Sequence, residues 1–334
     1  MPHLSLRLFG PFSASYGGEP LGRFRTLKSQ ALLIYLIAEP TAAHRREAVM
    51  DLLWPDLPLE SAQVNLRQSI YQLRKTIPQV ASQHGGLTSL VLSERHTIQI
   101  SPDALLDVDA LAFDTLVTGV RRHDHTGVAE CHLCRSRLEQ AAALYRGVFL
   151  ADFYLEDSNE FENWAQGRRS KFRAQAAETL ATLAESHLRD GNYSAAEQHA
   201  RRQLELDNFD ERAYRQLMEA LAHDGRRNEA IETYGIARRV LREELGMAPS
   251  AKTAQLAERI EANKLIPTLE PARALPPIRG YKLLEEIGVG TVGRVYRAFQ
   301  PVIGREVAVK AILPRYANLP DFIRRFEAEA QTVA

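Results

Sequence analysis

Cysteine, net charge and long apolar runs are all scarce in this chain of 334 residues. Its two cysteines are too few for the disulfide framework of a small secreted protein, which favours a reducing cytoplasm. The longest apolar run, Ala31 to Ala38, is far shorter than the ~20 residues that cross a membrane. The N-terminus also lacks a signal-peptide pattern. We therefore expect a soluble, cytoplasmic protein without a membrane span.

The formal net charge is zero, so no global electrostatic field draws the chain towards nucleic acid. Residues 1–100 contain ten Lys or Arg against seven Asp or Glu, which neither requires nor excludes a local DNA-binding surface. With 45% hydrophobic residues, a chain of this length predicts two or three globular domains of ~100 to 200 residues each.

The most informative stretch runs from Leu59 to Ile77. On a helical period its apolar residues fall on one stripe, which consists of Leu66, Ile70, Leu73 and Ile77. The outward and flanking side chains are Asn65, Arg67, Gln68, Tyr71, Gln72, Arg74 and Lys75. Amides can read adenine and cations can read guanine in a major groove, although an ordinary solvated helix has a similar face. The surrounding elements must decide between these two interpretations.

The neighbouring patterns favour DNA. Residues 3–25 alternate as short strands, and helical patterns cover Thr26 to Ala38 and Arg45 to Leu53. Residues 88–100 read as two strands around a polar tip that contains Arg95 and His96. This order predicts a winged helix-turn-helix, whose third helix enters the major groove and whose hairpin tip reaches a phosphate or minor groove. A hairpin tip is also polar when it is merely solvated, so the order of the three helices is the stronger signal.

Two runs carry a family resemblance. LFGPFSASYGGEPLGRFRTLKSQALLIYLI and REAVMDLLWPDLPLESAQVNLRQSIYQLRK resemble the OmpR-type DNA-binding domain of the Streptomyces antibiotic regulatory protein family, over residues 4 to about 100. The resemblance implies a sequence-specific transcriptional regulator that binds direct repeats beside promoters. Its implied partner is double-stranded promoter DNA.

Residues 104–263 read as helices only. Three residue pairs are separated by the tetratricopeptide period of 34, namely Leu183 with Leu217, Gly191 with Gly225, and Ala196 with Ala230. A generic helical bundle is the alternative. The runs RLEQAAALYRGVFLADF, FENWAQGRR and LREELGMAPS resemble the bacterial transcriptional activation domain that follows the winged helix in the same family. That resemblance implies a homodimer and contacts with RNA polymerase.

The two cysteines, Cys131 and Cys134, follow His123 and His125 closely, and thiolates with imidazoles are zinc ligands. A structural zinc site usually combines two such couples, and the sequence contains one. Two cysteines three residues apart on a helix more often pack as small hydrophobic residues. We therefore predict no metal here.

A proline-rich linker, residues 264–280, precedes a different pattern. Gly288 begins the motif G-x-G-x-x-G-x-V, and the strand-like run Val-Ala-Val-Lys ends at Lys310. A strand after the glycines argues against a Rossmann domain, in which a helix follows. This segment resembles the start of a bacterial Ser/Thr protein kinase. The resemblance implies ATP contacts at Ile287, Gly288, Gly290, Gly293, Val295, Ala308, Lys310 and Glu329.

The catalytic H-R-D loop and the D-F-G segment do not occur in these 334 residues. We therefore expect no phosphoryl transfer, no required cofactor and at most weak ATP binding, with a parent polypeptide that continues into a kinase. The predicted fold is multidomain. It comprises an α+β winged helix-turn-helix (1–103), an all-α tetratricopeptide-like domain (104–263), the linker (264–280) and an incomplete α+β kinase N-lobe (281–334). The rival hypothesis is a protein kinase whose first two domains are protein-docking modules.

Overall fold

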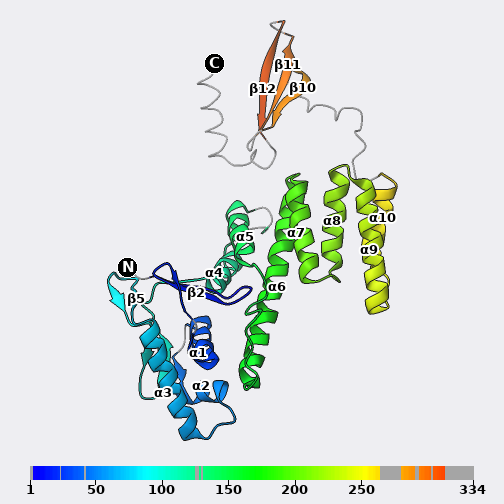
Figure 1. Ribbon diagram of the computed structural model, residues 1–334. Coiled ribbons are helices and arrows are strands. Elements are labelled where there is room, and N and C mark those ends of the chain that lie inside the picture. Colours follow the sequence, from blue (N-terminus) through cyan, green and yellow to red (C-terminus); the bar gives the residue numbers. More distant parts are fainter. Residues whose placement is uncertain are drawn as a thin grey trace. The chain divides into compact units, whose positions relative to one another are not determined.

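The computed structural model describes residues 3–22, 24–40, 43–124, 128, 131–263, 280–289, 293–301 and 304–312 (Figure 1). The chain divides into two compact units, Met1–Leu265 and Ile266–Ala334, which are described separately below. Among the described residues, no helix is both long and apolar enough to cross a membrane.

The first unit opens with a four-stranded sheet. Strands β1 (Leu4–Arg7), β2 (Ser13–Tyr16) and β3 (Glu19–Pro20) are antiparallel neighbours, and β9 (Leu106–Val108) pairs in parallel with β1. The alternation seen in the sequence buries Leu4 and Leu6 completely. Since successive side chains of a strand point to opposite faces, one face of this sheet is core.

Three helices follow at the predicted places. They are α1 (Leu27–Ala38), α2 (Arg46–Leu53) and α3 (Leu59–Thr76). Helix α1 begins where it does because the Thr26 hydroxyl accepts a hydrogen bond from the Ser29 N–H at 3.1 Å, which satisfies a free donor of the first turn.

The predicted hairpin is confirmed as well. Strands β7 (Val91–Ser93) and β8 (Thr97–Ile100) are antiparallel, and the Glu94 N–H donates to the Thr97 carbonyl at 2.9 Å across the tip. Strand β4 (His44–Arg45) adds to β8, and a small pair, β5 (Val80–Ala81) with β6 (Leu87–Thr88), lies between α3 and the hairpin in sequence. We call the β7–β8 hairpin the wing.

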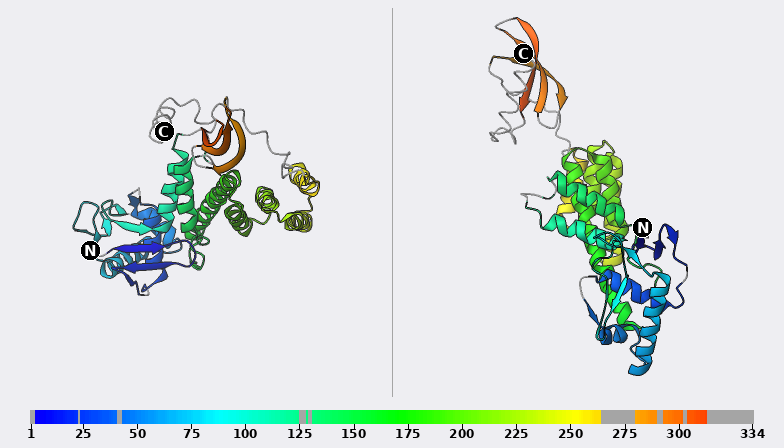
Figure 2. Two further views of the ribbon diagram at one scale, coloured as in Figure 1. Left: turned by 90° about the horizontal axis from the view of Figure 1, so that it is seen from above. Right: turned by 90° about the vertical axis from the view of Figure 1, so that its left-hand side faces the viewer.

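The remainder of the first unit is helical. The helices are α4 (Asp109–Arg121), α5 (His132–Leu144), α6 (Asn159–Arg189), α7 (Tyr193–Leu206), α8 (Glu211–His223), α9 (Arg227–Leu245) and α10 (Ala251–Glu261). Helices α6 to α10 lie side by side in sequence order (Figure 2). Gly191 and Gly225, with φ of +74° and +81°, provide the left-handed turns after α6 and α8. The paired residues Leu183, Leu217, Ala196 and Ala230 are buried, as the repeat predicts.

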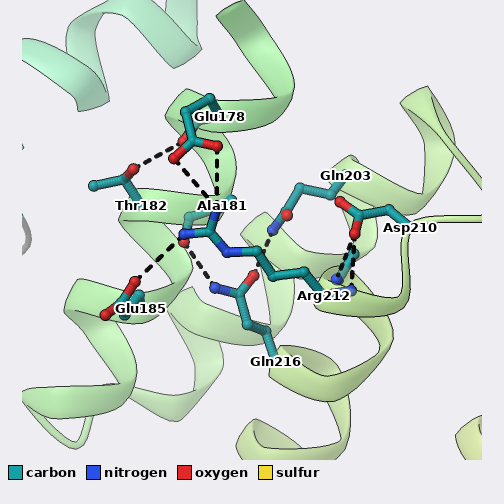
Figure 3. Close-up of polar contacts among 9 residues, drawn as sticks. Glu178, Ala181, Thr182, Glu185, Gln203, Asp210, Arg212 and Gln216 are labelled. Carbon is teal, nitrogen blue, oxygen red and sulfur yellow. Dashed lines mark hydrogen bonds and ion pairs between the residues drawn. The ribbon is translucent and has the colours of Figure 1, made fainter. Parts of the chain in front are cut away.

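Polar contacts set the register of α6, α7 and α8 (Figure 3). Arg212 bridges Glu178 and Glu185 of α6 at 3.0 and 3.4 Å. Beneath it, the Gln216 amide donates to the Ala181 carbonyl at 2.8 Å and accepts from the Gln203 amide at 3.0 Å. Because a buried amide without partners destabilises a core, this chain of hydrogen bonds favours one alignment of the three helices.

The winged helix and the helical segment share one core. Phe9, which follows β1, packs edge-on against Phe113 of α4 and Phe172 of α6, with ring centroids 5.4 and 5.2 Å apart. Asp109, at the start of α4, is fully buried and accepts hydrogen bonds from the Leu8 N–H at 2.8 Å and the Phe9 N–H at 3.3 Å. The boundary predicted between residues 103 and 104 thus falls just before β9, which returns to the first sheet.

The second unit contains a three-stranded antiparallel sheet in the order of the sequence. Its strands are β10 (Lys282–Val289), β11 (Gly293–Gln300) and β12 (Arg305–Ile312). Tyr296 and Ala298 of β11 are buried. The strand predicted after the glycine motif and the strand predicted at Val-Ala-Val-Lys are therefore confirmed, whereas most of the predicted linker lies outside the described residues.

Candidate nucleic-acid interface

Helix α3 presents two chemically different faces. Leu66, Ile70, Leu73 and Ile77 are buried, which confirms the predicted apolar stripe. The predicted outward side chains differ in exposure. Those of Arg67, Gln68, Tyr71, Arg74 and Lys75 are exposed, whereas those of Asn65 and Gln72 are half-buried. The helix therefore offers a polar surface of amides and cations to a ligand.

Gln72, one of the predicted outward and flanking side chains, is half-buried and does not lie at the centre of the exposed face. It lines a hollow of about 300 Å³ beside the start of α1, together with Asn65, Gln68 and Lys28. Gln72 precedes the buried Leu73, and consecutive helix residues are ~100° apart, so its side chain points to the flank. Tyr71, which is 63% exposed, lies nearer the centre.

The wing is fastened to the helices by hydrogen bonds. Arg46, at the start of α2, donates to the Ser93 hydroxyl at 2.7 Å, and its own N–H donates to the His96 carbonyl at 2.9 Å. Arg74 of α3 donates to the Val91 carbonyl at 3.1 Å. Arg95 and His96 remain exposed at the tip. The wing is thereby held next to α3, in the position from which a winged helix contacts DNA.

A groove of about 760 Å³ lies between α2, α3 and the wing. We call it the basic groove, because its lining has more cations than acids. The lining side chains are those of Arg45, Arg46, Glu47, Met50, Gln63, Arg67, Glu94, Arg95, His96 and Thr97. The pKa of Arg46 is lowered, first by burial and then by the positive charges of Arg67 and Arg74. An anion bound in the groove would therefore relieve the repulsion among these guanidinium groups.

Two arginines of the basic groove, Arg45 and Arg46, are not among the DNA contacts predicted from the sequence. The predicted contacts lie on the third helix and the wing, whereas these arginines lie at the start of the second helix. The pair of adjacent arginines directly before the helical pattern of residues 46–53 was the available signal. Its relevance depends on the wing folding back over α2, which no local pattern shows.

The residues predicted to contact ATP lie in the second unit. Ile287 and Gly288 are on β10, Gly293 begins β11, and Ala308 is on β12. The strand pairing places Gly288 of β10 opposite Val295 of β11. Val295 is in turn opposite Lys310 of β12, whose side chain is exposed. Gly290 and Glu329 lie outside the described residues. The structure thus brings one glycine of the motif, Val295 and Lys310 to neighbouring positions of adjacent strands.

A third helix flanked by a wing and a basic groove places the first part of the chain in the winged helix-turn-helix class. Comparison with known proteins makes the assignment more specific. The family profile of the bacterial transcriptional activator domain matches residues 108–261. The regulatory protein DnrI of Streptomyces peucetius is 26% identical over 262 residues, which are 76% of this chain and 90% of DnrI. The chain thus carries a bacterial transcriptional activator domain, is similar to a regulator of the Streptomyces antibiotic regulatory protein type, and is a transcriptional regulator.

Two further similarities concern the fold and the second unit. A solved structure of Mycobacterium tuberculosis EmbR, in complex with a low-affinity phosphopeptide, superposes with a TM-score of 0.60 and 20% identity. It covers 79% of this chain and 66% of EmbR, and supports the fold alone. The serine/threonine-protein kinase PknA of Mycobacterium tuberculosis is 43% identical over 54 residues, which are 16% of this chain and 12% of PknA.

Proposed function

We propose that the chain activates transcription by binding promoter DNA in a sequence-specific manner through α3 and the wing. The basic groove carries this proposal. Its arginines, which belong to β4, α2, α3 and the wing, lie beside the exposed amides of α3. Guanidinium groups there would neutralise phosphates and fix the register, while the α3 side chains would read base edges. Because the formal net charge of the chain is zero, the attraction to DNA over long distances would come from the local cations of the basic groove.

The test is fluorescence anisotropy with a duplex selected from a random library and with a scrambled duplex, over a range of salt concentrations. Arg67→Gln and Arg95→Gln should each weaken binding to both duplexes and reduce the slope of log affinity against log salt by roughly 0.9 per lost phosphate contact. Arg239→Gln, at an exposed arginine of α9, is the matched control and should change neither quantity. If the wild-type chain binds no duplex, the proposal is wrong and the docking-module hypothesis takes its place.

We also propose that the helical segment forms a homodimer and contacts RNA polymerase, as the activator-domain family implies. Large apolar side chains exposed on and just after α9 support an interaction surface, namely those of Ile236, Leu245 and Met247. Sedimentation of the chain alone and with purified RNA polymerase tests both partners. Migration as a monomer that does not shift with polymerase would contradict this part of the proposal.

For the second unit, we propose an incomplete kinase N-lobe that binds ATP weakly and transfers no phosphate. The register that sets Lys310 opposite Val295, beside the glycine motif, supports this proposal. Lys310→Ala should abolish the binding of a fluorescent ATP analogue, while Lys282→Ala, an exposed lysine of β10, should leave it unchanged. Autophosphorylation by the pure chain that Lys310→Ala removes would instead favour the rival hypothesis, a protein kinase with docking modules.

A further inference from the structure

The end of α4 and the start of α5 bring together three side chains that the winged helix does not use. His123 lies just after α4, Cys131 is the residue before α5, and Cys134 is in the first turn of α5. The Nδ1 atom of His123 is 3.2 Å from the Cys134 sulfur and 3.6 Å from the Cys131 sulfur. The three donor atoms all lie within 4.8 Å of one another. The spacing of the cysteines was visible in the sequence, but this convergence was not.

We propose that His123, Cys131 and Cys134 bind a Zn²⁺ ion. In a tetrahedral site, Zn–S bonds of ~2.3 Å and a Zn–N bond of ~2.0 Å place nitrogen and sulfur about 3.5 Å apart. The two N···S distances, 3.2 and 3.6 Å, lie on either side of that value. Two sulfurs of such a site are ~3.8 Å apart. Since the three donor atoms lie within 4.8 Å of one another, the ion would fit after side-chain shifts of up to about 1 Å. His125, the other histidine of this loop, lies outside the described residues.

The charges around the donors suit a divalent cation. On binding, each cysteine loses its thiol proton to solvent, so two thiolates and one neutral imidazole would balance the ion's charge. The first turn of α5 also favours negative charge, because its free N–H groups form the positive end of the helix dipole. Of the neighbouring guanidinium groups, that of Arg135 is paired with Asp190. That of Arg137 donates to the Gly119 carbonyl at 3.2 Å and keeps its positive charge, which the two thiolates would offset.

The burial of the donors indicates the coordination. Cys134 is fully buried in a cluster with Val120, Leu138 and Leu183, as the sequence predicted for a packed cysteine. Cys131 and His123 are half-buried, which leaves one side of the site open to a water molecule as the fourth ligand. The metal would connect the end of α4 to the start of α5, and its binding energy would stabilise the helical segment.

A disulfide between Cys131 and Cys134 is the competing chemistry, because a Cys-x-x-Cys pair at a helix start is also a common redox pair. The two alternatives differ in one residue. Zinc requires His123 as a ligand, whereas a disulfide does not. Zinc also requires both sulfurs to be reduced. Variants of His123 therefore distinguish a metal site from a redox pair.

The experiment uses the full chain, reduced and stripped of metal with a chelator, and titrated with Zn²⁺ against a chromophoric competitor and separately with Co²⁺. We expect one equivalent of zinc per chain, and for cobalt the thiolate charge-transfer band and intense d–d bands of a tetrahedral site. His123→Ala and Cys131→Ser should each lower zinc affinity at least ~100-fold, since loss of a ligand costs more than loss of a supporting contact. His132→Ala, at the exposed histidine between the cysteines, should bind zinc like the wild type.

Circular dichroism of each variant separates lost binding from lost folding, and Cys131→Ser is informative even if His123→Ala unfolds. Zinc should also raise the melting temperature of the wild type but not that of His123→Ala. The proposal is wrong if the reduced chain holds no stoichiometric zinc, or if His123→Ala leaves the affinity unchanged. A chain isolated with a Cys131–Cys134 disulfide that, once reduced, still binds no zinc would identify a redox pair instead.

Discussion

Replacing Asp109 with alanine should lower the free energy of unfolding of the first unit by about 3 to 5 kcal/mol, as expected when a buried, hydrogen-bonded charge is removed. The carboxylate is fully buried and accepts the N–H groups of Leu8, Phe9 and Ala110 at 2.8, 3.3 and 2.8 Å. Arg146 lies 3.7 Å from it. Alanine would leave these three donors inside the core without an acceptor. Urea denaturation followed by circular dichroism measures the change.

Asp107, two residues earlier, supplies the matched control. It pairs with Arg7 at 2.6 Å on the surface, where the side chains are 41% and 33% exposed. Exposed pairs contribute ~0 to 1 kcal/mol, so Asp107→Ala should have a small effect. The loss of unfolding free energy for Asp109→Asn should lie between those for Asp107→Ala and Asp109→Ala. The amide keeps one acceptor oxygen but turns its NH₂ towards a backbone donor. Equal losses for Asp107→Ala and Asp109→Ala would show that the buried carboxylate does not hold β1 to α4.

The second large effect should appear in DNA binding. Gln68→Ala should cost about 1 to 3 kcal/mol on the selected duplex and nothing on a scrambled one, because an amide that pairs with a base edge contributes only when that base is present. Gln72→Ala, on the flank beside α1, should cost less. Gln198→Ala, an exposed glutamine of α7, is the control for the substitution itself. Anisotropy titrations on both duplexes provide the comparison.

Lys75, exposed near the end of α3, should behave differently from Gln68. As a phosphate contact it carries no sequence information, so Lys75→Ala should weaken binding to both duplexes and reduce the salt slope by roughly one. If neither Gln68→Ala nor Lys75→Ala changes binding to either duplex, the outer face of α3 is a solvated surface.

Local patterns predicted the helices and the wing because their information is local. The buried stripe of α3, from Leu66 to Ile77, follows from a 3.6-residue period, and the repeats at Gly191 and Gly225 follow from a fixed spacing. In each case, consecutive members of the pattern are about one helical turn, or one repeat, apart in the sequence. Such patterns need no knowledge of what the element packs against.

Contacts between distant residues could not be predicted in this way. Phe9 and Phe113, or Leu8 and Asp109, are about a hundred positions apart, and nothing in either neighbourhood identifies the partner. The same holds for the basic groove, which Arg46 lines only because the wing returns to α2. The third ligand of the proposed zinc site, His123, likewise lies near the two cysteines only because α4 packs against α5.

The shared core around Phe9 has a consequence for how such a regulator must be placed on DNA. Strand β9 runs directly into α4, so we expect the helical segment to keep one orientation relative to the winged helix. When α3 lies in a major groove, the orientation of the binding site along the DNA then determines from which side of the duplex α9 and α10 project. Moving the site by half a helical turn, ~5 base pairs, would carry them to the opposite side. Activation by a chain of this build should therefore depend on helical phase, with productive spacings between site and promoter that recur once per turn.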